Sequence, residues 1–218
     1  MQDLQFRLFG FSIRVLPGFW LLCGVYLLFG LQNQEPIWAI VSFVAVVFAS
    51  IVLHELGHAV TARRLGLRVG WIRLHTYGGD VTHDPGRPWQ NLAVSLGGPG
   101  AGLLFGALVF GIAWLLPYNL YVDRVVHQLL WVNVVWSLFN LLPMCPLDGG
   151  NALGHGLSVF NVKSAWPIAW AVSAVCGLVI AGAGFHIGWF FVGLIGAYVV
   201  FNNVQRLHIW RQQRGRLF

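Results

Sequence analysis

Charged side chains are scarce in this chain of 218 residues. Asp, Glu, Lys and Arg together make up 9% of it, whereas hydrophobic residues make up 57% and the mean hydropathy is +0.71. A soluble domain has about a quarter of its residues charged. This shortage of charge excludes a soluble globular protein and indicates a polytopic membrane protein.

Cysteine is also rare, with three residues in the whole chain. All of them lie in or beside apolar stretches, at Cys23, Cys145 and Cys176. This placement does not indicate a structural disulfide framework.

Apolar runs long enough to cross a bilayer, about 17–25 residues each, recur along the sequence. We count six of them, at 16–32, 36–62, 91–116, 126–146, 165–185 and 187–205. The first run has no basic segment before it and no small-residue cleavage site after it, so we expect a retained span and not a signal peptide.

The net charge of +6 is explained by topology better than by nucleic acid. With six spans, twelve of the thirteen basic residues fall on one side, and only Arg124 falls on the other. The positive-inside rule then places both termini in the cytoplasm. We therefore expect a multi-pass protein, in the cell membrane if the source is prokaryotic, with the lipid bilayer and not nucleic acid as a partner.

The second apolar run contains the sequence His54-Glu55-Leu56-Gly57-His58. On a helix, His54 and His58 are one turn apart on one face, so both imidazoles can bind one metal ion while Glu55 stands beside it. Chance placement gives roughly 0.003 such motifs in a chain of this composition. The motif predicts a zincin-type Zn²⁺ site inside the membrane.

A catalytic zinc site needs a third protein ligand and leaves a position open for water. Of the seven acidic residues, only Asp148 lies at the end of a span on the same side as the histidine pair. The second and fourth spans run in the same direction, so their C-terminal ends meet at one membrane face. Prolines and glycines across 140–150 break the helix there, which is tolerated only inside protein or along a water-filled cavity. We predict Asp148 as the third ligand.

These motifs together resemble the site-two protease family of intramembrane zinc metalloproteases. The resemblance covers nearly the whole chain and is carried by the His54–His58 motif, Asn140-x-x-Pro143-x-x-Pro146-Leu147-Asp148-Gly149, Ile13-Arg14-Val15-Leu16-Pro17, Gly78-Gly79 and Gly98-Pro99. The family's Gly-Pro-x-x-Asn pattern is broken, because Gly102 stands where the Asn is expected. No room remains for an inserted PDZ domain or a CBS pair, so we expect a minimal core.

The resemblance implies an endopeptidase that cuts membrane-spanning segments of protein substrates near the cytoplasmic face. Glu55 would be the general base, and Asn140 either binds the substrate backbone or oxyanion or satisfies the broken helix. Gly78 and Gly79 would belong to a substrate-binding hairpin. We expect one domain over 1–218, with the catalytic helix at about 36–63 and the third-ligand span at about 126–150.

The expected fold is all-α and polytopic, with about six transmembrane helices and a small membrane-associated sheet. Strand-like residues at 68–81 and 6–15 predict that sheet, and its edge could hold an unwound substrate. Two other functions stay open: a metal-ion transporter, since intramembrane His and Asp can form an ion pathway, and a catalytically silent binder of transmembrane segments. A base at Glu55 favours proteolysis over both. The oligomeric state is left open.

Overall fold

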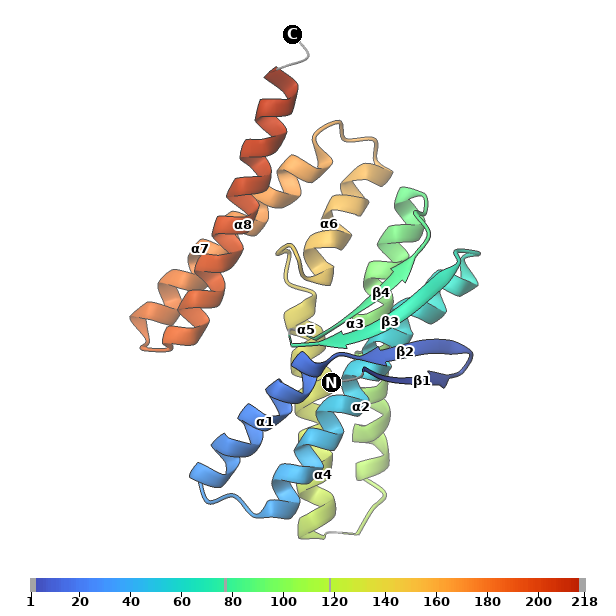
Figure 1. Cartoon of the computed structure of the whole chain (residues 1–218), viewed down its shortest axis with the longest axis vertical. Helices are drawn as coiled ribbons and strands as arrows, with labels where there is room; N and C mark the ends of the chain where they lie inside the picture. Colours follow the sequence, from blue (N-terminus) through green and yellow to red (C-terminus); the bar gives the residue numbers. More distant parts are fainter. Residues whose placement is uncertain (1–2, 77, 118, 216–218) are drawn as a thin grey trace. The chain divides into compact units, whose positions relative to one another are not determined.

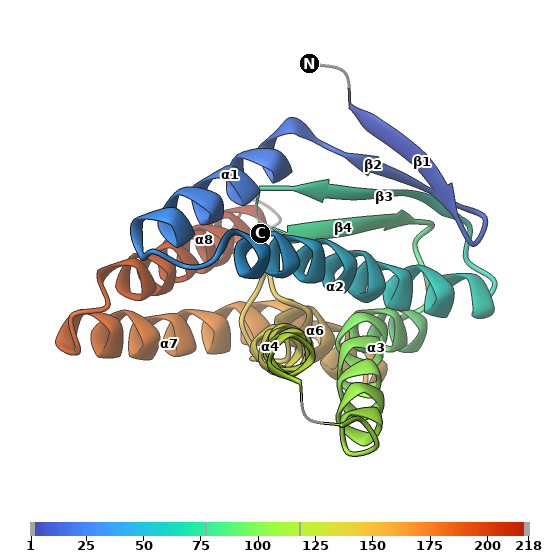
Figure 2. The ribbon, with the colours of Figure 1, turned by 90° about the horizontal axis from the view of Figure 1, so that it is seen from below.

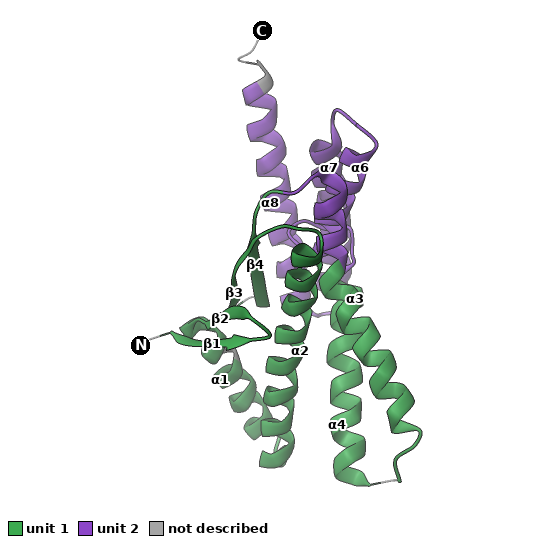
Figure 3. Ribbon diagram, turned by 90° about the vertical axis from the view of Figure 1, so that its right-hand side faces the viewer, with its two compact units in different colours: residues 1–85, 97–139 green, residues 86–96, 140–218 purple. Residues whose placement is uncertain are grey.

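The structure is a computed structural model that describes residues 3–76, 78–117 and 119–215. Its chain forms two compact units, coloured separately in Figure 3. Unit 1 comprises Met1–Pro85 and Gly97–Phe139, and unit 2 comprises Gly86–Leu96 and Asn140–Phe218.

A four-stranded sheet in the order β1-β2-β3-β4 forms one layer of unit 1. Its strands are β1 (Leu4–Leu8), β2 (Phe11–Val15), β3 (Val69–His75) and β4 (Gly78–His83). The outer pairs are antiparallel, whereas β2 and β3 run parallel. Gly10 has a φ of +82° in the turn between the first two strands, a conformation that glycine adopts without strain. Both predicted strand regions are therefore confirmed.

The helix α2 (Ile37–Arg64) is the centre of unit 1. Figure 2 shows the sheet on one side of it and α4 (Leu120–Leu130), with the unit 1 part of α3 (Pro88–Ala113), on the other. Alternate residues of β2 are buried, which is the period-2 pattern of a half-buried strand, and they join Ile51, Val52 and Leu56 of α2 in one apolar core. This packing fixes the sheet against the helix that carries the histidine pair.

Two further segments complete the helical part of unit 1. Helix α1 (Pro17–Gln32) packs on α2. Helix α4 continues directly into a π-helical turn, η1 (Trp131–Val135), and then into α5 (Trp136–Asn140), whose last residue is counted with unit 2.

Unit 2 contains the start of α3 and three more helices, α6 (Asp148–Val159), α7 (Ala165–His186) and α8 (Phe190–Gly215). Helices α7 and α8 lie side by side along their length (Figure 1). Glycines make this close approach possible: a Cβ on Gly177 would stand 3.0 Å from the carbonyl oxygen of Gly196.

Among the described residues, four helices are long and apolar enough to cross a membrane: α2, α3, α7 and α8. A mostly helical membrane protein with a small sheet is therefore confirmed. Helical structure occurs at each of the six predicted stretches, but α1 has only 16 residues and the fourth stretch is built from three consecutive segments. The count of six spans stays a prediction.

Candidate metal centre

The three polar residues of the His54–His58 motif lie on one buried part of α2. His54, Glu55 and His58 are 5%, 4% and 7% exposed. The helix has no charged residue before this motif, so an apolar helix presents two imidazoles and one carboxyl group to the protein interior. Keeping such groups buried is costly without a ligand or partner.

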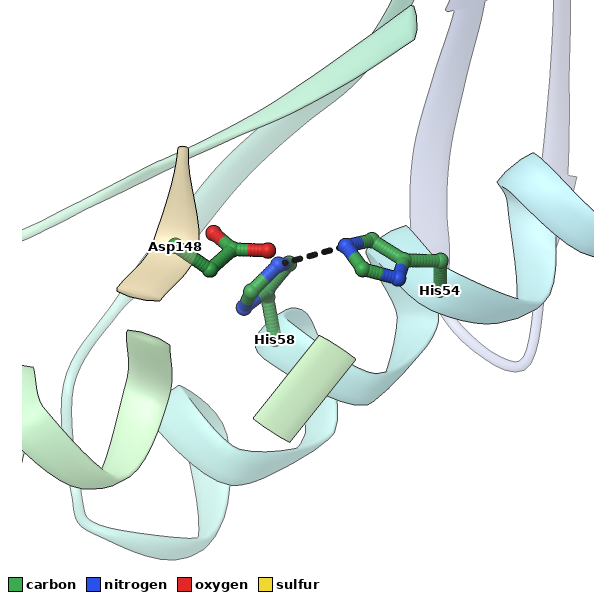
Figure 4. A group of neighbouring side chains, drawn as sticks. All are labelled: His54, His58 and Asp148. Atoms are coloured by element: carbon green, nitrogen blue, oxygen red, sulfur yellow. Dashed lines mark hydrogen bonds between the residues drawn. The ribbon is translucent and has the colours of Figure 1, made fainter. Parts of the chain in front are cut away.

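The Nε2 atoms of the two imidazoles lie 3.2 Å apart, with the ring planes at 78° to each other. Figure 4 shows these two nitrogen atoms directed toward one another. Two nitrogen ligands at about 2.0–2.1 Å from a tetrahedral zinc would be about 3.3 Å apart. The observed separation therefore fits two ligands of one metal ion. The i, i+4 spacing on a single helix produces this geometry without help from the rest of the chain.

Helix α3 approaches the histidine pair through glycine. A Cβ on Gly98 would stand 2.7 Å from Nε2 of His54 and would also collide with His58, so no other residue fits there without displacing the rings. The amide nitrogen of Gly98 lies 3.3 Å from Nδ1 of His58. Gly57 inside the motif is equally confined, because its Cβ would meet the Gly97 carbonyl. Gly98 is thus a packing surface for the two imidazoles.

Strand β4 covers Glu55. A Cβ on Gly79 would lie 2.5 Å from Cγ and 2.6 Å from both Cδ and Oε1 of Glu55, so the carboxyl group rests directly on the strand backbone. Gly78 has a φ of +124°, a backbone conformation that residues other than glycine rarely adopt. The neighbouring Tyr77 lies outside the described residues. The predicted hairpin therefore lies against the proposed base, and its two glycines are required for different reasons.

Asp148 is the first residue of α6 in unit 2. Between α5 and α6 the chain leaves the helical conformation over residues 141–147, as Pro143 and Pro146 predict. The glycines predicted to share in this break, Gly149 and Gly150, lie instead in the first turn of α6. Gly149 and Gly150 are buried, and a Cβ on either would collide with backbone atoms of this irregular segment. The segment therefore folds back over the start of α6 and holds the backbone of Asp148 in place.

Two polar residues inside apolar helices satisfy the backbone of that segment. Ser173 of α7 accepts a 2.8 Å hydrogen bond from the amide of Cys145, and Asn203 of α8 donates a 2.8 Å bond to the carbonyl of the same residue. Both side chains are almost fully buried, at 0% and 1% exposed. Sequence reasoning missed them, although a polar residue in the middle of an apolar span is itself a signal.

A further hydrogen-bonded pair, which we did not predict from the sequence, links α2 to the π-helical turn. Asn133 donates a 2.9 Å hydrogen bond to the hydroxyl of Ser50, one helical turn before His54. Gly102 packs here too, because a Cβ on it would collide with the Ser137 hydroxyl. At the position where the family pattern has Asn, the close contact of α3 with α5 leaves no room for a side chain. Gly106, one turn further along α3, is close to the π-helical turn in the same way, because a Cβ on it would stand 2.7 Å from a methyl carbon of Val134.

Asn140 ends α5 and is 9% exposed. It adjoins the irregular segment, so its place in the chain agrees with both roles considered for it. Its function stays a prediction.

Comparisons with known proteins find similarity to a peptidase family and to zinc metalloproteases. Residues 42–120, which include the histidine motif, match the model of Peptidase family M50. The chain is 34% identical over 158 residues to sll0528 of Synechocystis sp., which carries a provisional zinc metalloprotease name; this covers 67% of the chain and 41% of the relative. It is 28% identical over 153 residues to zinc metalloprotease MJ0392 of Methanocaldococcus jannaschii, covering 70% of the chain and 44% of the relative. The chain thus spans less than half the length of these curated relatives.

Among solved structures, the chain matches the site-2 protease from Methanocaldococcus jannaschii with a TM-score of 0.71 and 24% identity, over 94% of this chain and 95% of the other. The fold and the buried histidine pair define a membrane protein with a zincin-type helix. The resemblance to the site-two protease family, Peptidase family M50, is confirmed: the chain has the fold of a site-2 protease and matches the M50 model over 42–120.

Proposed function

We propose that the chain is an intramembrane zinc endopeptidase that cleaves membrane-spanning segments of protein substrates. The observation that carries this proposal is the buried arrangement on α2. There the Nε2 atoms of two imidazoles lie 3.2 Å apart, and Glu55 is next to His54 in the sequence. The M50 match over the same residues and the zinc metalloprotease names of the relatives support it.

His54, His58 and Asp148 would hold the zinc ion. In support, the histidine pair is buried on α2, and Asp148 is the first residue of α6, at the end of the predicted span that reaches the same membrane face. Two neutral imidazoles and one carboxylate are a donor set that leaves zinc a position for water. Because the set draws on both units, we propose that the whole chain acts as one catalytic domain.

Glu55 would be the general base. The chemistry that a bound zinc supplies at such a site is a more acidic water and a polarised scissile carbonyl. The Glu55 carboxylate takes the proton of the attacking water and delivers it to the departing amine. The backbone of β4 at Gly79 confines this carboxyl group, so its position is set before the substrate arrives.

Strand β4 is the last strand of the sheet order and would receive the substrate. A transmembrane helix has its peptide bonds hydrogen-bonded internally, so it must unwind before it can be cut. Pairing with β4 would hold the unwound segment extended beside Glu55, since Gly79 already touches that residue. Asn140 would hydrogen-bond the substrate backbone or the developing oxyanion.

Cleavage would occur near the cytoplasmic face. The charge asymmetry of the sequence supports this orientation, with both termini and the loop after α2 in the cytoplasm. The C-terminal half of α2, which bears the motif, precedes Arg63 and Arg64 on that side.

Purified protein mixed with a panel of single-span substrates tests the proposal. We expect cleavage that stops when zinc is chelated and returns when zinc is restored, and loss of both zinc and cleavage in a His54→Ala/His58→Ala variant. A metal transporter would instead move zinc across proteoliposomes without cutting any substrate. A silent binder would retain the substrates intact, and either result would overturn the proposal.

A further inference from the structure

Unit 2 contains a cavity that no part of the proposed reaction uses. It has a volume of about 560 Å³, within the range of ligand pockets. It lies where the connection between α6 and α7 comes near the C-terminal half of α8, an end of unit 2 visible in Figures 1 and 3. Its lining combines aromatic and basic side chains, chiefly Trp166, Pro167, Trp170, Trp210, Lys163 and Arg206.

The two basic residues lack acidic neighbours. Asp148 is the one acidic residue in the sequence of unit 2, and within the described residues neither Lys163 nor Arg206 forms an ion pair. Both side chains are exposed. The cavity therefore has two positive charges that no ion pair among the described residues neutralises, which favours an anionic occupant.

A bilayer crossed by α8 would place the cavity at the depth of the lipid headgroups. Arg206 and Trp210 come 16 and 20 residues after the start of α8 at Phe190, which is about 24 and 30 Å along the helix. The hydrocarbon core of a bilayer is about 30 Å thick, so a span that begins near Phe190 leaves the membrane at these residues. Tryptophan is enriched at that interface, and the first residues of α7 reach the same cavity.

We propose that this cavity binds the headgroup of an anionic phospholipid. Lys163 and Arg206 contact the phosphate, while the tryptophan rings pack against the glycerol and the first acyl carbons. The N-terminal end of α7, where Ala165 and Trp166 line the cavity, adds a favourable partial positive charge. Basic pockets between transmembrane helices at the cytoplasmic side are suited to such headgroups.

Lipid titration of the purified full chain in detergent, followed by native mass spectrometry, tests the site. Phosphatidylglycerol should bind at least tenfold more tightly than phosphatidylcholine. Arg206→Gln and Lys163→Gln should each weaken phosphatidylglycerol binding about fivefold, and the double variant about 25-fold. Arg211→Gln is the matched control, because it removes the same charge from α8 outside the cavity; its affinity should stay within about twofold of wild type.

Equal losses of phosphatidylglycerol affinity in Arg206→Gln and Arg211→Gln would overturn the proposal, since only general surface charge would then matter. Equal binding of the two lipids would overturn it as well. Displacement of the lipid by millimolar inorganic phosphate or by soluble glycerophosphoglycerol would show a site for free anions instead. Zinc content should be unchanged in every variant. Failure of the proposed lipid site is therefore distinguishable from failure of the proposed protease activity.

Discussion

Gly79→Ala should separate zinc binding from catalysis. The added methyl group would lie 2.5–2.6 Å from three atoms of Glu55, whereas non-bonded carbon atoms normally approach to about 3.5–4.0 Å. Relief requires the carboxyl group to move by about 1 Å. Gly79 has no left-handed φ and pairs with Leu74 in the regular register, so alanine is compatible with the strand backbone.

A displacement of about 1 Å in a reacting group costs on the order of 100-fold in rate. We therefore expect Gly79→Ala to cleave a single-span substrate about 100-fold more slowly than wild type while keeping one zinc per chain, because the three atoms nearest to the added Cβ all belong to Glu55 and none to a histidine. Single-turnover cleavage rates and metal analysis of the same preparations measure the two quantities.

Gly100→Ala is the matched control. Its Cβ would point into open space, with nothing within 4 Å, so the same methyl group should leave rate and zinc unchanged. A Gly79→Ala protein that cleaves within threefold of wild type would refute the reasoning, because Glu55 would then not be confined by β4 or would not be the base. Loss of zinc in Gly79→Ala would refute it too, by showing damage to the histidine pair.

Two more predictions concern the fold around the site. Asn203→Leu should lower the free energy of unfolding by about 1–3 kcal/mol and weaken zinc binding, because it leaves the Cys145 carbonyl buried without its donor. Asn202→Leu is the control: Asn202 precedes Asn203 and donates to the Tyr198 carbonyl within α8, so its loss should change either quantity much less in a denaturant titration and metal assay. Cysteines introduced at Arg68 and Asn119 should be labelled from opposite sides of the membrane, the first from the cytoplasm, and labelling of both from one side would contradict the six-span topology.

Local patterns explain why much of the site is predictable from the sequence. The spacing of His54 and His58 alone fixes their common face, because every α-helix has the same period. The break before Asp148 follows from the two prolines in it, Pro143 and Pro146, whose effect on a helix is equally local. The strands at 6–15 and 68–81 follow from their residue types and their glycine turns.

Contacts between distant segments could not be predicted in the same way. Nothing near Gly79 in the sequence indicates that its missing side chain makes room for Glu55, because the hairpin and the helix meet only in three dimensions. Asn203 lies 58 residues from the carbonyl that it binds. The π-helical turn at Trp131–Val135 also has no sequence pattern that distinguishes it from an ordinary apolar helix.

The most direct test of the proposed protease is a comparison of wild type with Glu55→Gln. Glutamine has nearly the same size and keeps the packing against β4, but its amide cannot take a proton from water. We predict unchanged zinc content and a cleavage rate lower by roughly 100- to 10,000-fold, the usual contribution of general acid–base catalysis. Cleavage by Glu55→Gln at the wild-type rate, with zinc bound, would contradict the central claim.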